Sequence, residues 1–374
     1  MKPVMRGISS LILALGAAGL ASAGPANTVA VSARGETTPV GTANDDAADD
    51  PAIWRNPKRP GDSLIVATDK KAGLYVYDMA GKVRSFEPDG RLNNVDLIDL
   101  GQGGVIVVAS DRNDPAQASL RIYRLNTTNA RLKPLGIAPG GAGEGYGLCL
   151  LQSGRGLYAF SVLKHGVVEQ VRLDLSGRTA TGRIVRSLKV ETQAEGCVAD
   201  PRTQTLYVGE EARGIWAFDA RFSGKVEGRL VAQVDSKQLF ADVEGLAILP
   251  QRRKGGWLIA SSQGDNAYAL YRLPDMTPAG RFRIAAGQYG ATDETDGIAL
   301  AGGKFGPIYP DGLLVVQDGD NAPHAQNFKL VSWQDVLRAL ASADVRVSSS
   351  VSTVSSLRPE MRTDEVLTDN LNGL

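Results

Sequence analysis

One short pattern recurs six times along this chain and limits its possible folds more than any other feature. Five of the copies begin with an acidic or amide residue, which in three of them directly precedes a glycine, and an apolar run follows. The copies are Asp49–Trp54, Asn93–Leu97, Gly145–Leu148, Glu195–Val198, Glu244–Ile248 and Asp296–Leu300. They lie about 44 to 52 residues apart, a period that is typical of repeat architectures.

A second pattern follows each copy in step with it. It consists of a β-rich strand, a polar loop and another β-rich strand, and apolar alternation such as Leu74-Tyr75-Val76-Tyr77 is typical of strands. The segments are Ser63–Asp78, Val105–Leu125, Leu157–Leu173, Leu206–Asp219, Trp257–Leu273 and Leu313–Trp333. Six copies of both patterns predict an all-β fold, a six-bladed β-propeller with four-stranded blades around a central channel. A jelly roll or an immunoglobulin array would not explain why the two patterns stay in step.

The two ends of the chain differ from the repeats. Residues 1–23 combine a short basic region, an apolar stretch and Ala21-Ser22-Ala23, which together predict a secretory signal peptide. The mature protein is therefore expected to be secreted or periplasmic, with the propeller domain at 24–340. Thr28–Ala33 is predicted to be a strand that completes the last blade and removes an exposed edge. Residues 341–374 lack turn signals and a seventh repeat, which predicts a C-terminal tail that is disordered in part.

Charge and cysteine content exclude several classes of function. The chain has 41 basic and 41 acidic residues, so no overall field favours nucleic acid or a membrane surface, and we expect a monomer without either partner. Beyond the signal, no apolar run is long enough to span a bilayer. Cys149 and Cys197 either pair or remain two buried thiols. No Cys-x-x-Cys motif or Cys/His cluster suggests zinc or haem.

The polar loops between the paired strands are sorted by charge. In the first three repeats they carry Lys70, Lys71, Arg112 and Lys164, and in the last three they carry mainly carboxylates. The strand starts add further carboxylates, namely Glu195, Asp242, Glu244, Asp293, Glu294 and Asp296. Because equivalent positions of all blades face one end of the channel, these side chains are predicted to form one rim, basic on one side and acidic on the other.

Such a rim restricts the chemistry of its ligands. Carboxylates packed together repel one another unless cations lie among them, and oxygen ligands without His or Cys suit calcium better than magnesium. Lys and Arg suit phosphate oxygens. A single Asp-Gly loop is usually only a turn, and the recurring glycines are most simply backbone devices. The convergence of all these positions favours a polyanionic ligand that is bridged to metal on one side and held by cations on the other.

The residues in these segments resemble the β-propeller phytases, a bacterial family of calcium-dependent 3-phytases. The resemblance extends from Glu36 to Trp333. Its most specific stretches are Asp46–Trp54, Asp69–Leu74, Leu92–Asp96, Gly209–Glu211, Asp242–Leu246, Ala260–Asn266, Thr295–Ile298 and Val316–Gly319.

The resemblance implies a calcium-dependent phosphomonoesterase that hydrolyses phytate, myo-inositol hexakisphosphate, to lower inositol phosphates and inorganic phosphate. It implies attack by metal-activated water, with several Ca²⁺ ions as cofactor and phytate as small-molecule partner. Catalytic calcium ligands are implied at Glu36, Asp49, Glu195, Glu211, Asp242 and Glu244, and phosphate-binding residues at Lys70, Arg112, Tyr146 and Lys164. Structural calcium is implied near Asp50 and near Asp318–Asn321, including Asp320 and Asn321.

The chain departs from the family pattern near Gly290, where the family usually has an acidic residue. Either one structural calcium ligand is missing or Asp293 replaces it. Two alternative functions also remain open at this stage. One is another secreted propeller hydrolase, such as a lactonase or phosphodiesterase, although a neutral lactone would not need the basic half of the rim. The other is a propeller that binds phosphate without turning it over.

Overall fold

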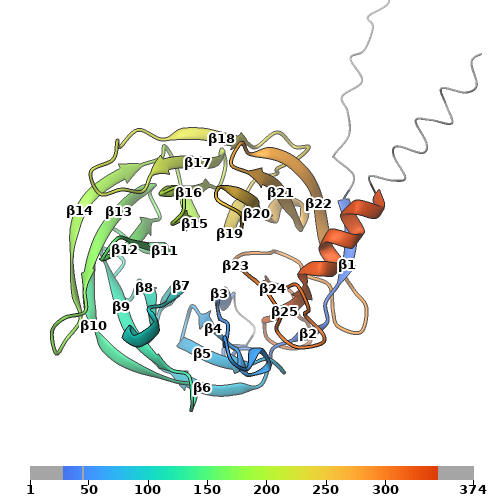
Figure 1. The fold of residues 1–374 in the computed structure, drawn as a ribbon, viewed down its shortest axis with the longest axis horizontal. Helices are drawn as coiled ribbons and strands as arrows, with labels where there is room; N and C mark the ends of the chain where they lie inside the picture. Colours follow the sequence, from blue (N-terminus) through green and yellow to red (C-terminus); the bar gives the residue numbers. More distant parts are fainter. Residues whose placement is uncertain (1–27, 44–45, 344–374) are drawn as a thin grey trace, which may run out of the picture.

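Six β-sheets form a ring around a central channel in the computed structural model, which describes residues 28–43 and 46–343 (Figure 1). The predicted six-bladed β-propeller is therefore confirmed. The predicted signal peptide, residues 1–23, lies outside the described residues, and so does residue 344 onward of the predicted tail.

The first three blades are built from consecutive antiparallel strands. Blade 1 contains β3 (Ala48–Trp54), β4 (Leu64–Asp69), β5 (Gly73–Asp78) and β6 (Val83–Glu87). Blade 2 contains β7 (Leu92–Asp99), β8 (Val105–Asp111), β9 (Gln117–Asn126) and β10 (Arg131–Ala142). Blade 3 contains β11 (Gly145–Ser153), β12 (Gly156–Leu163), β13 (Val167–Asp174) and β14 (Thr181–Lys189). Short 3₁₀ turns, η1 (Pro60–Asp62) and η2 (Gly101–Gly103), lie between β3 and β4 and between β7 and β8.

The last three blades follow the same plan with additions at both ends of the chain. Blade 4 contains β15 (Ala194–Asp200), β16 (Thr205–Glu210), β17 (Gly214–Asp219) and β18 (Arg229–Gln233). Blade 5 contains β19 (Val243–Gln251), β20 (Gly255–Ser262), η3 (Gln263–Asp265), β21 (Ala267–Leu273), β22 (Thr277–Ala285) and β1 (Thr28–Ser32). Blade 6 contains β23 (Ile298–Gly302), β24 (Gly312–Asp318), β25 (Asn327–Ser332) and β2 (Gly35–Glu36). The repeated pattern of the sequence thus corresponds to the innermost strands, β3, β7, β11, β15, β19 and β23.

The prediction that the N-terminal strand completes the last blade was wrong. β1 pairs in parallel with β22 and so extends blade 5, whereas the two residues of β2 pair with β25 and complete blade 6. Residues 333–343 form a helix that carries the buried Trp333 and Val336 into the core between blades 5 and 6. Figure 1 shows this helix beside β1, so both described ends of the chain cover the same part of the ring.

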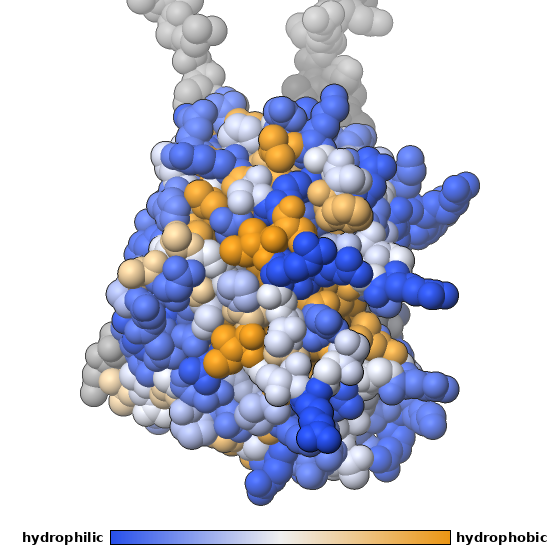
Figure 2. Space-filling model, turned by 90° about the vertical axis from the view of Figure 1, so that its left-hand side faces the viewer, coloured by the Kyte–Doolittle hydropathy of each residue, from blue (hydrophilic) through white to orange (hydrophobic). Residues whose placement is uncertain are grey.

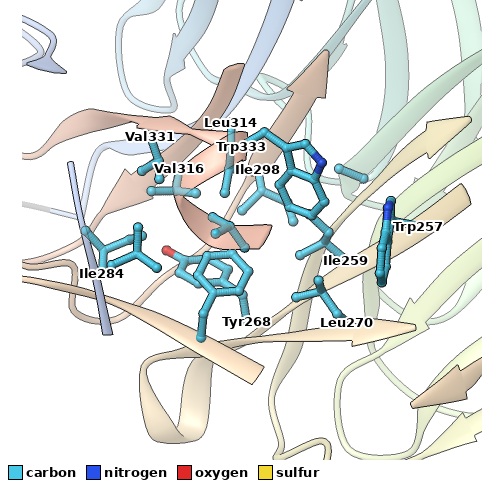
Figure 3. Close-up of a cluster of buried hydrophobic side chains, with 14 of the residues drawn as sticks. Trp257, Ile259, Tyr268, Leu270, Ile284, Ile298, Leu314, Val316, Val331 and Trp333 are labelled. Carbon is cyan, nitrogen blue, oxygen red and sulfur yellow. The ribbon is translucent and has the colours of Figure 1, made fainter. Parts of the chain in front are cut away.

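Among the described residues the core consists of six separate apolar clusters, each between two neighbouring blades. The cluster between blades 5 and 6 includes Trp257 and Trp333, whose ring centroids are 6.2 Å apart in an edge-to-face arrangement (Figure 3). Burial of apolar surface at every junction holds the blades at fixed angles, which keeps the channel mouth rigid.

The inner strands approach one another very closely at their starts, and the recurring glycines permit it. A Cβ atom on Gly147 would lie 1.8 Å from the carbonyl oxygen of Glu195, and one on Gly196 would lie 2.1 Å from that of Glu244. The interpretation of these glycines as backbone devices is consistent with these contacts.

Cys149 and Cys197 form a disulfide, with their Cα atoms 5.7 Å apart. The bond connects β11 to β15 and so ties the inner strands of blades 3 and 4 together. Of the two alternatives for these cysteines, pairing is the one found. Such a cross-link restricts the unfolded chain and typically stabilises a fold by about 2–4 kcal/mol.

The outer surface over β10 and β14 is mainly hydrophilic, with apolar side chains interspersed (Figure 2). Ile137 and Ile184 are among the exposed apolar residues of these two strands. Within the described residues, no helix is long and apolar enough to cross a membrane.

Candidate metal site at the channel mouth

A β-bulge recurs at the same place in five blades and determines which side chains face the channel mouth. The pairing register shifts between Ala48 and Pro51 in β3, and at the corresponding place in β7, β11, β15 and β19. The first residue of each bulge is, in blade order, Asp49, Asn93, Tyr146, Glu195 or Glu244, and Asp296 holds the corresponding place before β23. Bulges redirect side chains and are common next to active sites.

A second ring of side chains follows the second strand of each blade. Its members in blades 1 to 5 are Lys70, Arg112, Lys164, Glu211 and Gln263. Each of these residues donates its backbone N–H to a carbonyl just before the inner strand, for example Glu211 to Gln193 at 3.0 Å. This repeated hydrogen bond brings the two rings together at one end of the channel, as the sequence predicted.

Three glutamates from two adjacent blades meet at this mouth. Carboxylate oxygens of Glu195, Glu211 and Glu244, which we call the glutamate triad, lie within 4.8 Å of one another, and all three residues are buried. They line a cavity of about 440 Å³ together with Lys70, Tyr146, Asp242 and Asp296, among others. Six of the ten residues predicted to bind substrate or catalytic calcium therefore share one cavity.

The electrostatics of the triad favour a cation. Burial, followed by the nearby Asp49, raises the pKa of Glu195 well above its usual value, and burial with Asp296 does the same for the pKa of Glu244. Burial also raises the pKa of Glu211. Two buried oxygens, Asp49 Oδ1 and Glu244 Oε2, have no hydrogen-bond partner among the described residues. An all-oxygen donor set with unpartnered atoms fits a hard divalent cation.

Lys70 is the central cation of blade 1. Its ammonium lies 2.9 Å from Asp46, 3.1 Å from Asp49 and 3.2 Å from Asp296, which raises its pKa although burial opposes this. Asp49 itself is 1% exposed. The arrangement holds Lys70 beside the acidic side of the cavity rather than in free solvent.

The other two predicted phosphate-binding cations lie close to the ring of Tyr146. The Arg112 guanidinium lies 5.8 Å and the Lys164 ammonium 5.0 Å from the centroid of the Tyr146 ring, distances at which both cations are attracted to the ring face. Lys164 also lines a neighbouring cavity of about 540 Å³ with Glu144, His165 and Glu191. The basic side of the rim thus continues outward from the triad.

Glu36 is not placed with the triad. It lies on β2, where its Oε2 accepts a 2.7 Å hydrogen bond from Lys329, the residue directly opposite on β25. The same ammonium lies 3.0 Å from Asp318 Oδ2 and 3.1 Å from Asn321 Oδ1. We call Glu36, Asp318, Asn321 and Lys329 the blade 6 cluster. Burial alone would raise the pKa of Glu36, but the hydrogen bond from Lys329 holds this pKa below its usual value.

The blade 6 cluster does not fit a structural metal in the way the triad does. Its three oxygen ligands already surround the Lys329 ammonium, which is fully buried, and a divalent cation sharing those oxygens would be repelled by it. Asp320 Oδ1 accepts a hydrogen bond from the backbone of Ala322 instead. A Cβ atom on Gly290 would lie 3.5 Å from Lys329 Nζ, so the departure noted in the sequence is at the edge of this cluster.

Asp50 faces the channel below the mouth. Its Oδ2 accepts a hydrogen bond from Val95 N at 3.0 Å, and burial, followed by Asp49, raises its pKa well above the usual value. It lines a cavity formed by the inner strands, separate from the one that holds the triad. Asp50 thus remains a candidate ligand of a structural metal site separate from the triad.

Sequence reasoning gave some residues of the mouth no ligand or substrate role. Asp296 was predicted only as a carboxylate of the rim; in the structure it contacts Lys70 and accepts a 2.6 Å hydrogen bond from Gln263. Asn93 donates a 2.8 Å hydrogen bond to Glu195 Oε1, and its place in the second repeat is equivalent to that of Asp296 in the sixth.

The free energy of unfolding of metal-stripped protein is expected to fall between about pH 4 and about pH 7. Burial raises the pKa of Asp296 from 3.8 to about 7, so the folded protein binds a proton at this carboxyl more tightly than the unfolded chain does. The stability that this proton contributes is complete below the unfolded-state pKa and is lost as pH rises through the folded-state value. In urea unfolding, the free energy of unfolding of Asp296→Asn should rise relative to that of wild type by up to about 4 kcal/mol over this range. A pH-independent difference would contradict this.

Comparisons with known proteins agree with the geometry. The family model described as Phytase matches residues 3–353. The chain is 37% identical over 326 residues to the 3-phytase of Bacillus subtilis (strain 168), which covers 83% of this chain and 85% of the relative. A chain in the crystal structure of a mitotic checkpoint complex has a TM-score of 0.47 and 13% identity, covering 88% of this chain and 87% of that one. The last likeness says nothing about function.

Proposed function

This chain belongs to the phytase family, and from that membership we infer that it is a 3-phytase, which hydrolyses phytate with release of inorganic phosphate. The single observation that carries this inference at the level of chemistry is that the glutamate triad and Lys70 line one cavity. A polyanionic substrate needs cations on several sides, and the other half of the mouth supplies them. The likeness to a 3-phytase over most of the chain favours this function over a lactonase or a phosphodiesterase.

We propose calcium as the metal. Glu195, Glu211 and Glu244 would hold it, with Asp49 and Asp242 as further ligands, because oxygen-only sets with several carboxylates suit calcium. When bound, such a cation lowers the pKa of water and draws charge from phosphoryl oxygens. The structural calcium proposed near Asp50 rests on that buried carboxylate, whereas the blade 6 cluster supports no second structural ion.

The remaining residues of the mouth would bind and orient the substrate. Lys70, Arg112 and Lys164 would donate hydrogen bonds to phosphoryl oxygens and stabilise the charge that builds up on them during phosphoryl transfer. Arg112 and Lys164 both lie against the Tyr146 ring, so the two cations present a preorganised surface. Phosphates on neighbouring carbons of one substrate could contact the two cations together.

Export and assembly state complete the proposal. A signal peptide at 1–23, a propeller domain at 24–340, a tail at 341–374, a secreted or periplasmic location and a monomeric state all remain predictions of the sequence; the helix continues through residues 341–343. The Cys149–Cys197 disulfide is consistent with export, since such bonds persist in oxidising compartments.

The function is tested by release of inorganic phosphate from phytate, first with calcium and then with excess chelator. We expect turnover with calcium, loss of turnover with chelator and recovery when calcium is restored, because the triad cannot remain ionised and close-packed without a cation. Phosphate release that persists in chelator would contradict the metal assignment, and absence of release under all conditions would contradict the substrate.

A further inference from the structure

We propose that Gln193 is a positioning residue, which fixes the carboxylate of Glu211 so that the triad is arranged for metal binding. The inference rests on the proposed function of the triad and adds a residue that neither the sequence patterns nor the comparisons point to. Gln193 lies in the loop before β15 and lines the triad cavity.

Two hydrogen bonds connect Gln193 to Glu211. Its side-chain Nε2 donates to Glu211 Oε1 at 2.7 Å, and its carbonyl oxygen accepts the backbone N–H of Glu211 at 3.0 Å. The carbonyl of Glu211 in turn accepts the N–H of Val243 at 3.0 Å. The Glu211 backbone is therefore fixed between blades 4 and 5, and within the described part of the chain Gln193 gives its carboxylate the one hydrogen bond it receives.

The loop that carries Gln193 is itself anchored by the neighbouring glutamate. Glu210 is fully buried, and its Oε1 accepts hydrogen bonds from both the backbone N–H and the hydroxyl of Thr192, each at 2.6 Å. Its Oε2 accepts a 2.7 Å hydrogen bond from Trp216 Nε1. Adjacent glutamates thus have separate tasks, since Glu210 holds the loop and Glu211 faces the cavity.

The repeat explains why an amide is suited to this position. Gln193 lies two residues before Glu195, as Asp242 lies two residues before Glu244. The carbonyl of Gln193 accepts the backbone N–H of Glu211, and in the same way the carbonyl of Asp242 accepts that of Gln263. A carboxylate at position 193 would repel Glu211, whereas the amide donates to it. Burial raises the pKa of Glu211, and this hydrogen bond opposes that effect.

Gln193→Met tests the proposal because it keeps the length of the side chain and removes the donor. Calorimetric titration of the full chain with calcium chloride should show affinity about 10- to 100-fold weaker than wild type, the usual loss when a group that orients a metal ligand is removed. The calcium concentration for half-maximal phosphate release should rise by the same factor, while kcat at saturating calcium stays near that of wild type.

Gln238→Met is the matched control. Gln238 is a buried glutamine, whereas Gln193 is half-buried, and it donates to the carbonyls of Leu270 and Gly280, away from the triad. We expect this variant to lower Tm without changing calcium affinity. Wild-type affinity in Gln193→Met, whatever its Tm, would overturn the proposal. A wild-type protein that binds no calcium would instead remove the proposed function on which the inference rests.

Discussion

Glu244→Ala is expected to lower phosphate release from phytate by at least about 10²–10³-fold while the propeller stays folded. Loss of a preorganised electrostatic group in a buried site typically has an effect of this order. Glu244 is the triad member with an unpartnered buried oxygen, and its pKa is raised by burial and by neighbouring carboxylates, so its charge opposes folding unless a cation is bound. Initial rates at saturating calcium, together with Tm in chelator, measure both effects.

Removing this charge should leave Tm in chelator unchanged or higher, because repulsion with Asp296 and Glu211 disappears. Glu227→Ala is the control, since Glu227 is an exposed glutamate in the loop before β18. A Glu244→Ala variant that retains most of the wild-type rate would exclude the triad as the centre of catalysis.

Lys329→Met is expected to lower the free energy of unfolding by about 3 kcal/mol or more. The substitution leaves the buried Asp318 carboxylate and the partly exposed Glu36 carboxylate without their shared cation, and unpaired buried charges have costs of this order. It also removes the side-chain contact between β2 and β25, because Lys329 and Glu36 are directly opposite in the pair that completes blade 6. Urea unfolding in excess chelator measures the loss.

Repeating the measurement with calcium distinguishes an internal cation from a structural ion. We expect calcium to add the same increment of stability to wild type and to Lys329→Met, because it binds at the triad in both. If calcium restored the variant alone to wild-type stability, the blade 6 cluster would be a metal site after all. Lys82→Met, at an exposed lysine, controls for loss of surface charge.

The blades and most of the mouth could be predicted because each repeat carries its own local signal. Alternating apolar residues form the strands, and the residue beside the recurring glycine falls on the same bulge in blade after blade. Glu195 and Glu244 were predicted for the rim in this way, whereas Tyr146 was implied by the family resemblance. Asp296 carries the same signal, yet without coordinates nothing showed that Lys70 and Gln263 enclose it.

Other features had no local signal. Glu36 was implied to be a catalytic calcium ligand by the family resemblance, but its hydrogen bonds are to residues about 290 positions away in blade 6. The partner of β1 and the choice between a disulfide and two thiols likewise depended on how distant segments approach. Gln193 was not predicted because its partner, Glu211, lies 18 residues further along the chain.

The amino-acid sequence alone determined the number of blades, the strands within them and the sorting of charge around one rim, since turn chemistry, alternation and repeat register are properties of neighbouring residues. Only the tertiary structure decided which charges meet. Closing a ring brings residues from opposite ends of the chain within hydrogen-bond distance, and whether a carboxylate finds a lysine, an amide or an open cavity depends on those long-range contacts. For that reason the triad is left for a metal, while an ammonium of the chain itself occupies the blade 6 cluster.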